Sequence, residues 1–257
     1  MLCRLHHLKV KEVVQLLLER GAKVNAQGRG YGNALQVASS QGHKEVVQLL
    51  LEREANVNAQ GGHYGNALQA ASYQGHKEVV QLLLEGGGDV NMQGRDYGNA
   101  LQAASYKGHK EVVQLLLERG ANVNAQGGCY GNALQAASSQ GHKEVVQLLL
   151  EREANVNAQG GWFGDALRAA SYEGYCGIVQ LLLQSGANII HAVPFQLPWM
   201  SHELSNALEA ASYEGHIDIV KLLLDHGVEQ EHLDAALHKA KRTDIVNLLL
   251  EYGARHQ

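Results

Sequence analysis

The chain has 257 residues, a net charge of −5 and a hydrophobic content of 45%. This length suits one elongated domain, because single hydrophobic cores stop growing at about 250–300 residues. A basic excess, which nucleic-acid binding usually requires, is absent, and no run approaches about 20 apolar residues. We therefore expect no nucleic-acid partner and no membrane partner.

The cysteine pattern indicates a reducing compartment. Cys3, Cys129 and Cys176 are odd in number and form no CxxC pair, and residues 1–8 lack the apolar stretch of a signal peptide. We expect an intracellular, cytoplasmic protein.

Residues 1–24 are interpreted as a partial N-terminal repeat. The sequence Lys-Glu-Val-Val-Gln-Leu at 11–16 returns at 44–49. Only a poor copy of a preceding helix fits in residues 1–8, with no hairpin before it. We expect the chain to begin inside a repeat.

Residues 25–189 contain five near-identical repeats, which begin at Asn25, Asn58, Asn91, Asn124 and Asn157. Each repeat is about 33 residues long, and a fixed period of this length indicates an architecture in which each unit packs only on its neighbours.

The second copy shows how each repeat should fold. Asn66 is a good N-cap and Gln69 completes a capping-box arrangement, which predicts a first helix over 67–74. Gly75 should end it in the left-handed conformation. The apolar run that follows predicts a second helix over 77–85, and the Gly- and Asn-rich residues 58–65 predict a turn or hairpin.

The repeat resembles the ankyrin repeat. Asn-Ala-Leu-Gln at 66–69 stands where that family has Thr-Pro-Leu-His, while Gly75-His76 and Leu83-Leu84 match directly. The resemblance implies an all-α ankyrin-repeat solenoid of about eight units, with hairpin-like fingers and degenerate end caps. The Tyr-Gly-Asn-Ala-Leu-Gln variant further resembles repeats of fungal NOD-like, NACHT-type proteins, which implies that the array is a sensing end.

Two repeats lack the glycine that ends the second helix. Glu54 and Glu153 stand in its place, and a non-glycine residue in the left-handed conformation costs roughly 1 kcal/mol or more. We expect these two turns to close differently.

The C-terminal part departs from the period twice. Residues 190–230 form a repeat with eight extra residues, since the spacing from Asp165 to Asn206 is 41. This insertion holds Phe195 and Trp199, and it either packs over the neighbouring repeats or contacts a partner. Residues 231–257 have lost seven residues of the period and are interpreted as a C-terminal cap.

The sequence predicts no enzyme, no cofactor and no metal site. Stacked helices lie about 8–10 Å apart, whereas zinc needs its nitrogen ligands at about 2.0–2.1 Å. Histidines that occur once per repeat therefore cannot share a metal ion with their neighbours. We expect these histidines to make hydrogen bonds in the turns: His43, His76, His109, His142 and His216. Phosphate-loop, HExxH and GxSxG motifs are absent, and a ladder of identical residues does not bring unlike groups to one point.

The positions that vary between copies are the candidate binding residues. A turn position holds Gly30, His63, Asp96, Cys129 and Trp162, and a position near the end of the first helix holds Ser40, Tyr73, Tyr106, Ser139, Tyr172 and Tyr213. Resemblance to the ankyrin family implies that both lie on the concave surface. Drift at unconstrained exposed positions is the alternative, but Tyr and Trp are enriched at binding hot spots.

These observations favour a monomeric protein-interaction module that binds a protein or peptide partner along a groove. The fungal resemblance implies that the module is the recognition part of a larger immune-type or signalling protein. One alternative is an enzyme or small-molecule binder near Trp162, Phe195 and Trp199, and another is an architectural spacer. The predicted partner-binding residues are His63, Tyr73, Asp96, Tyr106, Cys129, Trp162, Tyr172, Phe195, Trp199 and Tyr213.

Overall fold

The computed structural model describes residues 2–28, 30–94, 96–190 and 204–256, with side chains described from residue 10 to residue 255 outside those gaps. The chain divides into two compact units, Met1–Gly128 (unit 1) and Cys129–Gln257 (unit 2). We describe each unit by itself.

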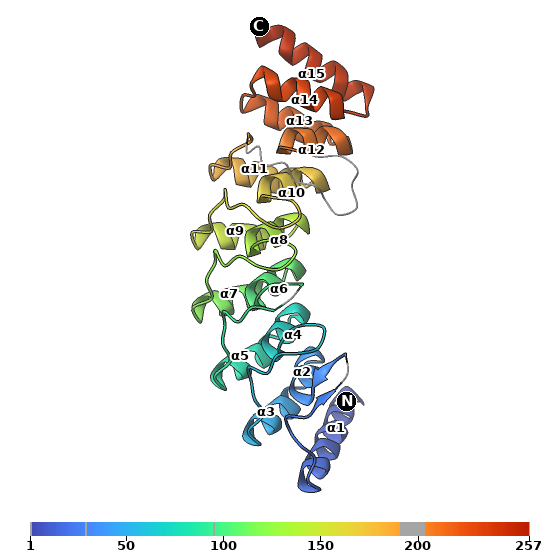
Figure 1. The fold of residues 1–257 in the computed structure, drawn as a ribbon, viewed down its shortest axis with the longest axis vertical. Helices are drawn as coiled ribbons and strands as arrows, with labels where there is room; N and C mark the ends of the chain where they lie inside the picture. The colour runs from blue at the N-terminus through green and yellow to red at the C-terminus, as the bar shows by residue number, and fades with distance from the viewer. Residues whose placement is uncertain (1, 29, 95, 191–203, 257) are drawn as a thin grey trace. The chain divides into compact units, whose positions relative to one another are not determined.

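The described residues of unit 1 form helices and one two-stranded hairpin (Figure 1). Its elements are α1 (Leu2–Glu19), β1 (Gln27–Gly28), β2 (Gly32–Asn33), α2 (Ala34–Ser40), α3 (Lys44–Glu52), α4 (Ala67–Gln74), α5 (Lys77–Glu85), α6 (Ala100–Lys107) and α7 (Lys110–Glu118).

The described residues of unit 2 are built from helices and connecting loops. Its elements are α8 (Ala133–Ser139), α9 (Lys143–Glu151), α10 (Ala166–Glu173), α11 (Cys176–Gln184), α12 (Ala207–Glu214), α13 (Ile217–Asp225), α14 (Gln230–Lys239) and α15 (Thr243–His256).

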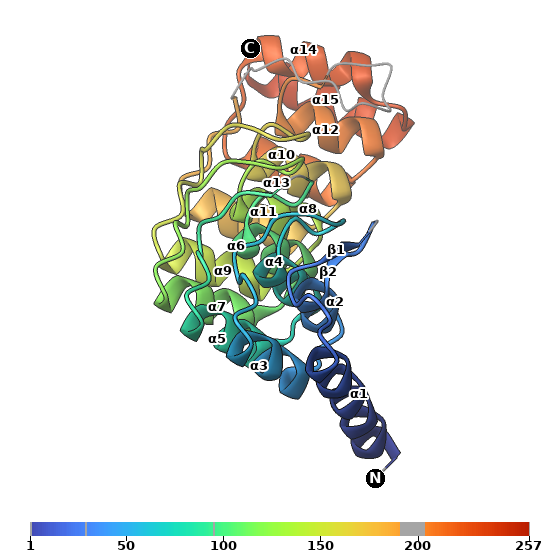
Figure 2. The same cartoon turned by 60° about the horizontal axis from the view of Figure 1, so that its bottom comes forward.

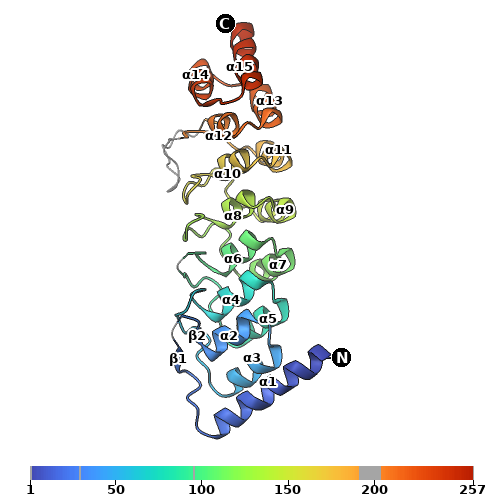
Figure 3. The same cartoon turned by 90° about the vertical axis from the view of Figure 1, so that its right-hand side faces the viewer.

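Within each unit the helices form two columns (Figure 3). The even-numbered helices, here called inner helices, stack on one another, as α4 does on α6 and α10 on α12. The odd-numbered outer helices form the second column, and the loops that join successive repeats project beyond the inner helices. The predicted helical repeat solenoid is confirmed.

Local sequence explains the inner helices. Asn66 Oδ1 accepts a bond from the Gln69 N–H at 2.8 Å, and Gln69 Oε1 accepts one from the Asn66 N–H at 3.0 Å. This predicted capping box satisfies N–H groups that the first turn leaves without helical partners. Gly75 ends the helix at φ 79°, as expected.

The same glutamine also joins one repeat to the next. Gln69 Nε2 donates to the carbonyl oxygens of Met92 at 3.1 Å and Gly98 at 2.7 Å, both in the following repeat. Gln69 is only 2% exposed. Buried polar groups must be paired, so these bonds hold the next connecting loop against the inner helix.

The connecting loops form short fingers, as predicted. β1 pairs antiparallel with β2 and extends beyond α2 (Figure 2). Isolated bridges join Gly61 to Gly65 and Gly160 to Gly164 at the same place in later repeats. Gly62 has φ 64°, and a Cβ there would lie 2.8 Å from backbone atoms of the preceding finger. Glycine at this position therefore allows neighbouring fingers to pack closely.

The expectation that Glu54 and Glu153 close their turns differently is wrong. Both residues adopt the left-handed conformation, with φ 61° and 63°. The bond from the Ala55 N–H to the Leu50 carbonyl, 3.0 Å, matches the one from Ala121 to Leu116, 2.9 Å, in a repeat that has glycine. Packing of the outer helix fixes the path of this turn. The glutamate therefore adopts a backbone conformation that is strained for a non-glycine residue.

We expect Glu54→Gly to raise the free energy of unfolding by about 0.5–1 kcal/mol, because glycine adopts φ 61° without a Cβ penalty. The neighbouring Arg53 has φ −101°, so Arg53→Gly should lower stability instead. Urea denaturation of both variants checks the pair. A stability loss in both would contradict this account.

The N-terminal segment differs from the two-part arrangement that the repeat pattern suggested. α1 is one continuous helix from Leu2 to Glu19. Lys9 and Val10 stand where the next repeat has Gly42 and His43, so the glycine that ends an inner helix is missing. One helix therefore runs through both positions.

The eight-residue insertion lies outside the described residues. The structure therefore does not test whether the insertion packs on the neighbouring repeats or contacts a partner. Its C-terminal boundary is held by Arg168, which replaces the usual glutamine. Arg168 Nη1 donates to the carbonyls of Leu204 at 3.0 Å and Ser205 at 3.1 Å, and its Nε donates to the Phe163 carbonyl. Burial lowers the pKa of Arg168, while Asp165 and Glu209 oppose that change.

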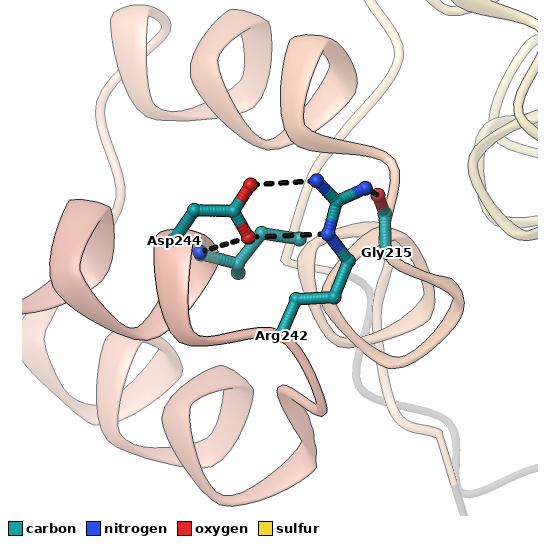
Figure 4. Close-up of polar contacts among 4 residues, drawn as sticks. Gly215, Arg242 and Asp244 are labelled. Carbon is teal, nitrogen blue, oxygen red and sulfur yellow. Dashed lines mark hydrogen bonds and ion pairs between the residues drawn. The ribbon is translucent and has the colours of Figure 1, made fainter.

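Within unit 2, Arg242 joins the last helix pair to the end of α12 (Figure 4). Its Nη1 donates to the Gly215 carbonyl at 2.9 Å, and its Nη2 contacts Asp244 Oδ2 at 2.6 Å. Hydrogen bonding with Arg242 lowers the pKa of the Asp244 carboxyl. Arg242 occupies the repeat position that histidine holds in most other repeats.

Candidate functional site

Four half-buried tyrosines gather on the inner helices and fingers of unit 1. This tyrosine cluster consists of Tyr64 and Tyr97 from two fingers, Tyr73 at the end of α4 and Tyr106 at the end of α6. The Tyr73 ring lies 5.3 Å from Tyr64, 4.6 Å from Tyr97 and 6.3 Å from Tyr106, between ring centroids. These distances suit favourable aromatic contacts and give a continuous surface across two repeats.

Polar groups surround the tyrosine cluster. Lys107 Nζ lies 4.6 Å from the ring centroid of Tyr73 and 5.5 Å from that of Tyr106, within the range of a cation–π contact. Gln74 Nε2 donates to the Tyr64 hydroxyl at 2.9 Å. The cluster therefore offers aromatic faces together with donors and a positive charge.

Two hydroxyl groups of the cluster are coupled. The Tyr97 hydroxyl donates to that of Tyr73 at 3.3 Å. Burial, followed by this bond and by charge interactions with Tyr73, Tyr106 and Asp96, raises the pKa of Tyr97. The Tyr97 hydroxyl stays protonated at neutral pH and remains a hydrogen-bond donor.

Sequence comparison between the copies found only part of this cluster. It predicted Tyr73 and Tyr106, which vary between repeats, and His63, whose ring centroid lies 5.1 Å from Tyr64 and 6.3 Å from Tyr97. It missed Tyr64 and Tyr97, because tyrosine recurs at that finger position and we selected positions that vary. The recurrence of an aromatic residue beside the variable finger position was the available signal.

A cleft of about 640 Å³ lies beside His63, and described residues of the first, second (60–65) and third (93–98) fingers line it, among them Gly30 and Gly94. Its walls include Gln60, Gly61 and Gln93, and Gln60 Nε2 reaches the Gln93 carbonyl at 3.4 Å. These walls supply amide and peptide groups, which suit polar contacts with another chain better than an apolar ligand.

Unit 2 brings two other predicted residues together. Trp162 and Tyr172 both pack against buried Phe163 and Ala169. The Trp162 ring also lies 5.3 Å from Tyr130, between centroids, and the Trp162 backbone N–H donates to the Cys129 carbonyl at 2.8 Å. Both side chains are half-buried, so each contributes to packing as well as to the surface.

The inner-helix ends of unit 2 carry acidic groups. Burial, followed by the charge of Glu214 and a hydrogen bond with it, raises the pKa of Tyr172 to about 12. Burial and Glu214 also raise the pKa of Glu173, against the opposing effect of His216. Lys241 Nζ lies 3.3 Å from the ring centroid of Tyr213, which places a cation on that predicted residue.

The remaining predicted residues are more dispersed. Asp96 is exposed on the third finger, and Cys129 is half-buried. Phe195 and Trp199 lie outside the described residues.

The repeated histidines join neighbouring repeats. Nε2 of His76, His109 and His216 lies 3.2, 3.0 and 3.0 Å from the carbonyl oxygens of Ser40, Tyr73 and Tyr172, each on the inner helix of the preceding repeat. The predicted structural role holds for these three, but the bond spans two repeats instead of closing a turn.

Among the described residues, the histidine–carboxylate group with ligand atoms within 4.8 Å of one another is Glu229, Glu231 and His232. Both glutamates are exposed, and His232 Nε2 lies 3.4 Å from Glu231. Such a surface group does not by itself constitute a metal site. No helix in the described part of the chain has the length and apolar character needed to cross a membrane.

Comparison with known proteins agrees with this architecture. The family model for ankyrin repeats (3 copies) matches residues 2–61, 59–127, 127–193 and 167–257. The crystal structure of the human ASB11 ankyrin repeat domain is similar at a TM-score of 0.72 and 24% identity, covering 86% of this chain and 97% of that one. No curated protein matched the sequence. The matches to the family model span nearly the whole sequence, and the chain belongs to the ankyrin-repeat family.

Proposed function

We propose that this protein binds a protein or peptide partner on the surface formed by its inner helices and fingers, with the tyrosine cluster of unit 1 as the main anchor. Ankyrin-repeat domains are generally protein–protein interaction modules, and a non-enzymatic binding scaffold is typical of this fold. Fold alone does not fix function, so the proposal depends on the residues of the site.

The arrangement of the tyrosine cluster carries the proposal. Four rings from two inner helices and two fingers meet at centroid distances of 4.6–6.3 Å, with Lys107 beside them. Tyrosine provides a large contact area at low entropic cost, since only two side-chain torsions are fixed on binding. Residues that serve packing alone would be fully buried, whereas these four remain partly exposed.

We further propose that the protein acts inside the cell, where reducing conditions would keep Cys129 and Cys176 as thiols. A role as the recognition part of a larger fungal immune-type or signalling protein is supported only by the resemblance of the Tyr-Gly-Asn-Ala-Leu-Gln sequence.

Affinity capture from a lysate of the source organism tests the proposal, with bound proteins identified by mass spectrometry. A variant with Tyr73, Tyr106, Trp162 and Tyr172 all replaced by alanine should retain its partner about 10-fold more weakly or worse. Gln81→Ala is the control, because Gln81 is exposed on the outer helix α5 of the same unit, away from the inner helices and fingers. Circular dichroism must show that helix content survives. Equal retention by the wild type and the four-residue variant would refute the proposal.

A further inference from the structure

The hydroxyl groups of the tyrosine cluster have hydrogens that the cluster itself does not use. The Tyr97 and Tyr73 hydroxyls share one hydrogen bond, in which Tyr97 donates at 3.3 Å, so the Tyr73 hydrogen is left over. The Tyr64 hydroxyl accepts from Gln74 Nε2 at 2.9 Å, and an amide nitrogen can only donate. No described residue accepts a hydrogen bond from the Tyr64 or Tyr73 hydroxyl. Both groups can therefore donate to an arriving molecule.

Lys107 adds a positive charge beside these donors. Its Nζ lies 4.6 Å from the Tyr73 ring centroid and 5.5 Å from that of Tyr106, and the residue is exposed. In the described part of the chain, no carboxylate forms an ion pair with Lys107. The Tyr64 ring lies 5.3 Å from the Tyr73 ring, between centroids, so two hydroxyl donors and an ammonium gather around Tyr73. A carboxylate, which accepts at both oxygens, matches this set of donors.

The equivalent surface of unit 2 has the opposite charge. Glu173 and Glu214 stand at the repeat position of Lys107. Burial, followed by the charge of Glu214, raises the pKa of Glu173, so the two carboxylates repel each other. Residues 1–128 contain 13 Lys or Arg and 11 Asp or Glu, whereas residues 129–257 contain 8 and 15. An acidic ligand is therefore attracted to the unit 1 surface and repelled by its unit 2 counterpart.

We propose that the tyrosine cluster binds an acidic peptide segment of the partner, with a carboxylate held by Lys107 Nζ and by the hydroxyls of Tyr64 and Tyr73. This specificity rests on the proposed function and defines the charge of the partner segment. The four rings cover carbon atoms of the segment, while the donors select its carboxylate. Asp96 opposes such a ligand, because its negative charge already acts on the neighbouring Tyr97.

Selection from a library of random peptides, with the purified chain immobilised, tests this specificity without a known partner. Lys107→Gln removes the charge, and Lys107→Glu reverses it. Both replacements fit the fold, because Gln74 and Glu173 stand at this position in other repeats. Arg53→Gln is the control, since it removes an exposed positive charge at the end of the outer helix α3. Circular dichroism of each variant must match that of the wild type.

The wild type and Arg53→Gln should select peptides enriched in Asp and Glu, whereas Lys107→Glu should select Lys and Arg instead. In calorimetric titration with one selected acidic peptide, Lys107→Gln should bind about three- to ten-fold more weakly than the wild type. Added salt should weaken the wild type more than Lys107→Gln, since less charge is then screened in the variant.

Two further variants separate the hydroxyl donors from the rings. Tyr64→Phe/Tyr73→Phe keeps both rings and removes both donors, and it should bind the same acidic peptide about three-fold more weakly or worse. Asp96→Asn removes the opposing charge and should bind that peptide more tightly.

The outcomes distinguish this specificity from the proposed function. Selected peptides that lack acidic enrichment, yet are lost with Tyr73→Ala/Tyr106→Ala, would overturn the acidic specificity and leave the binding site standing. Unchanged affinity of Lys107→Glu for an acidic peptide would overturn it as well. Selection of no peptide, or of peptides that bind Tyr73→Ala/Tyr106→Ala as well as the wild type, would overturn both.

Discussion

Replacing Gln135 with leucine should lower the free energy of unfolding by roughly 3 kcal/mol, although the two side chains are similar in size. Gln135 is 2% exposed, and its Nε2 donates to the carbonyls of Ala158, Gly160 and Gly164 at 3.0, 3.3 and 2.9 Å. Its Oε1 also accepts from the Asn132 N–H at 2.9 Å. Leucine leaves these backbone groups buried without that partner, so the side-chain half of the capping box and the attachment of the next finger are lost.

Urea denaturation followed by circular dichroism measures this effect. Gln147→Leu is the control, because Gln147 is an exposed glutamine on α9 whose side chain bonds to Glu151, at 3.0 Å, on the same helix. That change should stay within about 0.5 kcal/mol of the wild type. Faster amide hydrogen exchange at residues 158–164 should accompany the loss in Gln135→Leu. Equal stability of the two variants would show that the glutamine does not hold the repeats together.

Replacing Leu116 with alanine should lower the free energy of unfolding by about 2–5 kcal/mol. Leu116 lies on α7 and is 0% exposed, so its truncation loses apolar burial and leaves a cavity in the packed interior. Leu17 occupies the same repeat position on α1 but is 54% exposed. Leu17→Ala should therefore change stability by no more than about 0.5 kcal/mol.

Comparing Leu116→Ala with Leu17→Ala separates two effects on stability. The two leucines share a repeat position but differ in burial. A loss in Leu17→Ala as large as that expected of Leu116→Ala would contradict the exposure of Leu17 in the structure.

The helices could be predicted closely because the signals that bound them are local. Asn66, Gln69 and Gly75 begin and end α4 at the predicted residues, and the apolar run defines α5. Glu54 could not be predicted in the same way. Its conformation follows from contacts with other residues, including a 3.3 Å bond from Asn25 Nδ2 to the Glu54 carbonyl.

The candidate site could be predicted only in part, because it forms between repeats. Comparison of the copies selected Tyr73 and Tyr106, but it could not show that Tyr97 of a finger lies 4.6 Å from one and 5.6 Å from the other. Nor could it show that Lys107 lies over two of these rings. Such contacts depend on the distance and rotation between successive repeats, which packing of the Ala-rich inner helices sets.

Isothermal titration of the purified chain with a captured partner tests the central claim most directly, using the unit 1 variant Tyr73→Ala/Tyr106→Ala. If the tyrosine cluster is the anchor, affinity should fall about ten-fold or more, while Gln81→Ala on the outer helix α5 binds like the wild type. Unchanged affinity in the double variant, with its helix content intact, would contradict the assignment of this surface as the binding site.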